Sequence, residues 1–204
     1  MNCLQWQVIR VPIRTTTMNK DQYIQEATKY FHQRMHRDPN QSYNLYWVTI
    51  RPDLKWMKSV STYTQRRVLI EDLTRTLINK VERHLFKNPN RPCNSHKRID
   101  SRNVIETKDR YGNQDDHHQH GIWMVNHEFF YAFNHNLLET VLRKGTYLNQ
   151  PLTNVIQSIK IKQIDTTHNL EHLWAEDLVS TMDYMFKHCS DQKSPDWSTP
   201  WSYF

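Results

Sequence analysis

The order of two kinds of segment constrains the fold of this 204-residue chain more than any other feature. Short runs rich in β-branched and aromatic residues predict strands, and longer runs with apolar residues every three to four positions predict helices. The predicted strands are residues 4–14, 43–50, 99–108, 117–125 and 155–164, and the predicted helices are residues 19–36, 64–86, 128–144 and 169–188. We therefore expect an α+β fold in which a central antiparallel sheet of about five strands is flanked by helices.

The length of the chain and the absence of internal repeats predict one domain, spanning residues 1–204. Within it we expect an N-terminal extension over about residues 1–40. The last residues, about 190–204, include two prolines and predict an irregular tail.

The formal net charge of +6 suits a polyanionic partner, most simply nucleic acid. Only three glycines are present, so the chain has no glycine-rich phosphate loop and no recognisable ATPase or helicase module.

No apolar run approaches the length of a membrane span, and we expect no membrane partner. Three scattered cysteines predict no disulfide framework and favour a reducing compartment.

A histidine pair is the first candidate site, because His118 and His120 stand two positions apart in a predicted strand. Side chains alternate between the faces of a strand, so both imidazoles point to one side and could hold one divalent metal. A hairpin closing over residues 110–116 would bring the Glu106 carboxylate beside them. This ligand set suits Mn²⁺ or Mg²⁺ better than a closed structural zinc site. A β-bulge would exchange His117 for His118, and the pattern leaves that alternative open.

Tyr184 and Lys187 form the second candidate site, because residues three apart on a helix share a face. Tyr184 lies off the apolar stripe that runs through Leu178 and Met182. Lys187 could lower the cost of a phenolate or neutralise a phosphate. A metal beside a tyrosine hydroxyl is suited to attack on a phosphodiester, with the phenol as covalent nucleophile.

Further polar residues could contact DNA. Arg51 shares a predicted strand face with Thr49, and the lysines of residues 155–164 alternate with isoleucines, which places them on one face. The DNA-binding candidates are Thr49, Arg51, Lys108, Lys160 and Lys162.

Three segments, in this order, resemble the motifs of the rolling-circle replication initiators of the HUH endonuclease superfamily. YWVTIRP (46–52) is similar to the first motif, HHQHG (117–121) to the second and YMFK (184–187) to the third. The resemblance covers about residues 43–188. It implies a ferredoxin-like plait on which single-stranded DNA, including an origin hairpin, crosses a metal site.

The resemblance also implies roles for individual residues. His118, His120 and Glu106 would bind Mn²⁺ or Mg²⁺. Tyr184 would attack the scissile phosphate, forming a 5′-phosphotyrosyl link and freeing a 3′-hydroxyl, while Lys187 would assist. The implied setting is rolling-circle replication of a plasmid, phage or virus, in the cytoplasm of a bacterial or archaeal host or the nucleus of a eukaryotic one. A host helicase and polymerase would be partners.

The chain departs from the family pattern at two places. The middle residue of the histidine pair is normally hydrophobic and here is Gln119, which should face away from the metal and affect packing or a hydrogen bond. The predicted helix over residues 19–36 has no obvious place in the minimal pattern.

Other functions are compatible with the same residues. A single-tyrosine transposase would have the same site. A metal-dependent nuclease that activates water would leave Tyr184 incidental. A non-catalytic DNA-binding protein could use the histidines for a structural metal or for none.

Overall fold

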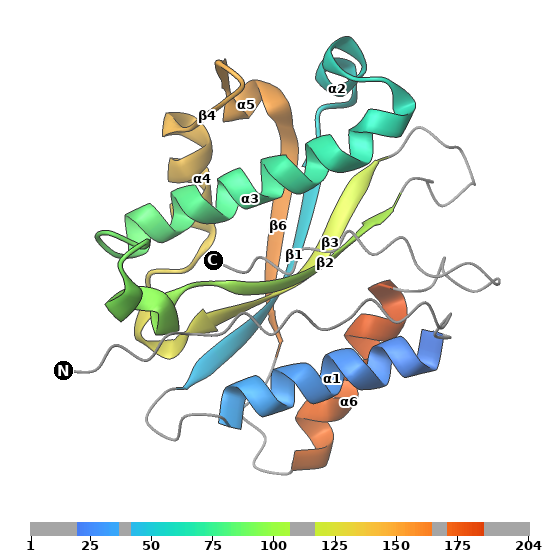
Figure 1. Ribbon diagram of the computed structural model, residues 1–204, viewed down its shortest axis with the longest axis vertical. Helices are drawn as coiled ribbons and strands as arrows, with labels where there is room; N and C mark the ends of the chain where they lie inside the picture. Colours follow the sequence, from blue (N-terminus) through green and yellow to red (C-terminus); the bar gives the residue numbers. More distant parts are fainter. Residues whose placement is uncertain (1–19, 37–41, 107–116, 165–170, 186–204) are drawn as a thin grey trace.

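Four strands form a central antiparallel sheet in the order β2-β3-β1-β6 (Figure 1). The computed structural model describes residues 20–36, 42–106, 117–164 and 171–185. The strands are β1 (Tyr43–Pro52), β2 (Asp100–Glu106), β3 (His118–Asn126) and β6 (Ile156–Ile164). The predicted α+β class is confirmed. The sheet has four strands in the described part of the chain rather than about five, and the predicted strand over residues 4–14 lies outside it.

Alternation along β1 gives the sheet two apolar faces. Val48 and Ile50 belong to one buried cluster, whereas Leu45 and the partly buried Trp47 belong to another. Because β1 pairs with both β3 and β6, its alternation sets which residues of those strands point to each face.

One face is covered by α3 (Arg66–Leu85), with α4 (His135–Lys144) and α5 (Leu152–Val155) beside it (Figure 1). Leu73, Leu77 and Val81 recur at helical spacing along α3 and are fully buried. This confirms the helix predicted over residues 64–86, whose buried side chains belong to the same cluster as Trp123 and Val125 of β3.

The opposite face is covered by α1 (Lys20–His36) and α6 (Glu171–Met185), which lie together in Figure 1. Phe31 of α1 and Met182 of α6 belong to the same buried cluster as Leu45. The Tyr30 hydroxyl donates a hydrogen bond to Asp100, and the Arg102 guanidinium lies 3.9 Å from the centre of the Tyr30 ring. The helix over residues 20–36 therefore contributes to the core of the domain.

Short elements complete the described structure: α2 (Leu54–Val60), η1 (Tyr63–Gln65), η2 (Pro92–Lys97), η3 (His127–Phe129), β4 (Thr146–Tyr147) and β5 (Gln150–Pro151). No helix in the described ranges has the length and apolar composition needed to cross a membrane.

One helix start and one unpredicted helix differ from the sequence prediction, and a side chain caps each of them. The helix predicted over residues 128–144 begins at His135, since the Asn134 side chain accepts a hydrogen bond from the Leu137 amide. The unpredicted α2 begins after Asp53, whose carboxylate accepts from the Trp56 amide at 2.6 Å.

Gly121→Ala should destabilise the fold by about 1–3 kcal/mol, the usual cost of overpacking. A Cβ at position 121 would lie 2.0 Å from Asn103 Oδ1. Asn103 is held in place because it accepts from Trp123 Nε1 and donates to Ser101 Oγ. Urea unfolding measures the loss. Val68→Ala, at an exposed position of α3, should change stability by no more than about 0.5 kcal/mol. Equal unfolding midpoints for the two variants would contradict this packing argument.

Candidate functional site

The register of β3 against β2 determines how the histidines are arranged. The pairs run without a shift from Asp100–Met124 to Glu106–His118. His118 and His120 therefore point to the same face of the sheet, the one covered by α1 and α6. The alternative bulge is absent from this register, and His117 is instead buried with its ring centre 5.1 Å from that of Tyr63.

Glu106, His118 and His120 form a buried triad that could hold a metal ion. His118 Nε2 lies 3.2 Å from Glu106 Oε2, and His120 Nε2 lies 3.5 Å from Glu106 Oε1. One ligand atom from each residue falls within 4.8 Å of the others. Ligands about 2.0–2.2 Å from one cation stand roughly 3–4 Å apart, so the three side chains fit a shared ion after small adjustments.

The electrostatics of the triad also favour a cation. All three side chains are buried, and each oxygen of Glu106 faces an imidazole nitrogen. A buried carboxylate is costly unless a positive charge pairs with it, which a protonated imidazole or a metal cation would supply. A divalent cation would compensate it fully and would use the lone pairs of both histidines. The identity of the metal does not follow from this geometry.

Tyr184 lies on the same face of the sheet as the triad. Its neighbours Met182 and Met185 are buried, whereas Tyr184 is 50% exposed and off the apolar stripe, as the helical pattern predicts. The Tyr184 ring centre lies 5.8 Å from that of His120 and 5.7 Å from that of Trp47. The phenol ring therefore contacts a candidate metal ligand. Lys187 lies outside the described residues.

Trp47 and Thr49 belong to this site and not only to the sheet. The Trp47 indole stacks on the His120 ring with centres 5.0 Å apart and planes at 28°. Thr49 Oγ1 lies 3.0 Å from His120 Nδ1 and accepts a hydrogen bond from Trp47 Nε1 at 3.1 Å. The sequence predicts that Thr49 contacts DNA, and it gives no role in the site to Trp47. Trp47 stands two positions before Thr49 and shares its strand face, and this alternation is the sequence signal that could have assigned Trp47 to the site.

The basic candidates occupy different places. Lys160 and Lys162 are exposed on the edge strand β6 and pair with Thr49 and Trp47, so they extend the face that carries the triad. Arg51 is half-buried near the end of β1, beside the register shift that follows it. Lys108 lies outside the described residues.

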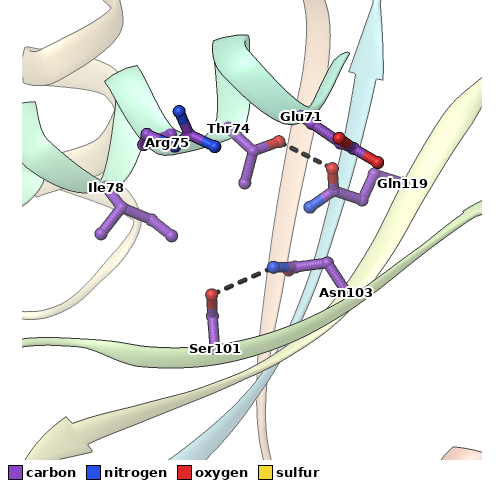
Figure 2. Close-up of a pocket in the computed structure, with 7 residues that line it drawn as sticks. All are labelled: Glu71, Thr74, Arg75, Ile78, Ser101, Asn103 and Gln119. Carbon is purple, nitrogen blue, oxygen red and sulfur yellow. Dashed lines mark hydrogen bonds between the residues drawn. The ribbon is translucent and has the colours of Figure 1, made fainter. Parts of the chain in front are cut away.

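A buried polar layer lies behind the histidine strand, between α3 and the sheet (Figure 2). Gln119 points into it and accepts a hydrogen bond from Thr74 Oγ1 at 2.8 Å. Asn103 and Ser101 are hydrogen-bonded in the same layer (Figure 2). The cavity there is about 10 Å³, near the lower limit for a single water molecule, so it is no substrate site. As expected, Gln119 faces away from the candidate metal ligands and makes a hydrogen bond.

No protein family model, curated protein or solved structure matches this chain.

Thr74→Val should lower the free energy of unfolding by about 1–3 kcal/mol, because the buried Gln119 carbonyl loses a donor. Chemical denaturation measures the change. Thr140→Val is the matched control, since the Thr140 hydroxyl donates to the Asn136 carbonyl at an exposed place where water can substitute. A Thr74→Val protein that unfolds at the wild-type denaturant concentration would rule out this role for the Thr74–Gln119 bond.

Metal binding should stabilise the wild-type chain. At a Mn²⁺ concentration 100 times the dissociation constant, the expected gain is about 2.7 kcal/mol. Glu106→Gln is nearly isosteric but removes the ligand charge, so thermal unfolding of this variant should respond little to Mn²⁺. Glu128→Gln, which alters an exposed ion pair with Lys97, should respond like wild type. An undiminished response in Glu106→Gln would exclude the triad as the binding site.

Proposed function

We propose that this chain is a single-tyrosine, metal-dependent endonuclease and strand transferase for single-stranded DNA, of the HUH type, that initiates rolling-circle replication of a plasmid, phage or virus. The observation that carries the proposal is the convergence of two independent elements on one face of the sheet. The β2–β3 hairpin supplies Glu106, His118 and His120, and α6 supplies Tyr184, whose ring contacts His120.

In the proposed reaction the Tyr184 phenolic oxygen attacks the scissile phosphorus. The bond from phosphorus to the 3′-oxygen breaks, a 5′-phosphotyrosyl bond forms, and the phenolic proton is ultimately carried by the released 3′-hydroxyl. A bound Mn²⁺ or Mg²⁺ would polarise the phosphate and stabilise charge as it develops. Lys187, in the Tyr-x-x-Lys segment, is proposed to assist at the phosphate.

Reversal of this step rejoins DNA, since a 3′-hydroxyl can attack the phosphotyrosyl bond. One ester bond is exchanged for another in each direction, so the cycle needs no ATP. This agrees with the absence of a glycine-rich phosphate loop in the sequence. Unwinding and extension would come from a host helicase and polymerase acting at an origin hairpin.

A row of residues across the sheet supports the proposal that the DNA backbone crosses this face. His120, Thr49 and Lys160 are successive partners across β3, β1 and β6. Adjacent strands lie about 4.8 Å apart, so the backbone at Lys160, whose side chain is exposed, lies about 10 Å from the backbone at His120. Lys162 lies two residues further along the same edge. The ammonium groups of these two lysines would attract DNA phosphates, and other residues would recognise the bases.

Tyr184→Phe should abolish the covalent adduct, because it removes the nucleophilic oxygen and keeps the ring that packs on His120 and Trp47. The assay incubates the protein with Mn²⁺ and labelled single-stranded origin DNA and separates adducts by denaturing gel. Tyr131→Phe, at an 88% exposed tyrosine, is the control and should form the adduct normally.

The products separate this proposal from its alternatives. An adduct that persists in Tyr184→Phe would remove the assigned nucleophile. Cleavage without any adduct would indicate hydrolysis by activated water, and binding without cleavage would indicate a non-catalytic DNA-binding protein. Excision and insertion of an element with defined ends would indicate a transposase.

A further inference from the structure

Thr49 connects the first β-strand to a candidate metal ligand. It stands directly opposite His120 in the β1–β3 register. Its hydroxyl oxygen lies 3.0 Å from His120 Nδ1 and 3.1 Å from Trp47 Nε1. Thr49 therefore contacts Nδ1 of His120, whereas the other ring nitrogen, Nε2, lies 3.5 Å from Glu106 Oε1.

The Thr49 hydroxyl can either accept Nδ1–H of His120 or donate to an unprotonated Nδ1, and coordination through Nε2 requires the first arrangement. An indole N–H can only donate, so Thr49 Oγ1 accepts from Trp47. The hydroxyl oxygen has a second lone pair that can accept Nδ1–H of His120. That arrangement leaves a lone pair on Nε2, which faces the Glu106 carboxylate. The other tautomer would place a proton on Nε2, where it would block coordination.

We propose that Thr49 is a positioning residue for the metal centre. Its hydroxyl accepts Nδ1–H of His120 and thereby holds the ring orientation and the tautomer in which Nε2 coordinates a divalent cation. The inference rests on the proposed metal site. The expectation that Thr49 contacts DNA stays a separate prediction.

Trp47 supports the same geometry in two ways. Its N–H occupies one lone pair of the Thr49 oxygen, and its ring stacks on His120 with planes at 28°. The stack restricts the tilt of the imidazole, and the Thr49 hydrogen bond restricts rotation within its plane. Residues that orient metal-binding histidines in this way typically raise metal affinity by about 10- to 100-fold.

The test compares wild type with Thr49→Val and Thr49→Ser. Thr49→Val keeps the shape of the side chain and removes the hydroxyl, whereas Thr49→Ser keeps the hydroxyl. The Mn²⁺ dissociation constant is measured at fixed pH from the electron paramagnetic resonance signal of free Mn²⁺, without DNA. We expect binding about 10- to 100-fold weaker in Thr49→Val and a return toward wild type in Thr49→Ser.

A second measurement uses only the wild-type protein, so it does not depend on the folding of a variant. Nitrogen-15 NMR of the histidine side chains, with Mg²⁺ bound, should show His120 protonated at Nδ1. A proton on Nε2 would overturn the inference, as would Thr49→Val binding Mn²⁺ like wild type. Wild-type-like Mn²⁺ binding by Thr49→Val would leave the metal site intact, whereas a proton on Nε2 would also remove His120 as a ligand through that nitrogen. Failure of the wild-type protein to bind Mn²⁺ would overturn both the metal site and the role of Thr49.

Discussion

The antiparallel register of β3, between β2 on one side and β1 on the other, determines both how the sheet packs and how the candidate metal centre is arranged. It places His118 beside Glu106 and His120 beside Thr49. A shift of one residue in a strand moves every side chain to the other face. Such a shift would send the imidazoles into the layer under α3 and bring Gln119 to the metal face. The candidate metal centre is therefore a consequence of strand pairing and not of flexible loops.

The register is specified by buried groups on both faces of the sheet. Under α3, the Gln119 carbonyl has a buried donor in Thr74, and Gly121 leaves room for the Asn103 amide. On the other face, Ile122 and Met124 pack in the cluster that α1 and α6 cover. A shifted strand would lose the Thr74–Gln119 and Trp123–Asn103 hydrogen bonds, and the loss of buried hydrogen bonds is costly. Stability and the geometry of the candidate site thus rest on the same contacts.

The sequence allowed most of this frame to be predicted, because strict alternation and helical spacing report which side of an element is buried. His118 and His120, Leu73 and Leu77 of α3, and the exposed position of Tyr184 followed from those periods. The start of α4 and the existence of α2 did not, since single capping side chains determine them. The contact of Thr49 with His120 could not be predicted either, because cross-strand partners depend on a register that a single sequence does not reveal.

Diffraction from crystals soaked in Mn²⁺, recorded where manganese scatters anomalously, would show whether the triad binds a metal. We predict one anomalous peak bonded to His118 Nε2, His120 Nε2 and a Glu106 oxygen, on the side of the sheet that carries Tyr184. Metal–ligand distances should be about 2.0–2.3 Å, as for other divalent ions with these ligands. A peak at other residues, or none at the triad under saturating Mn²⁺, would contradict this prediction.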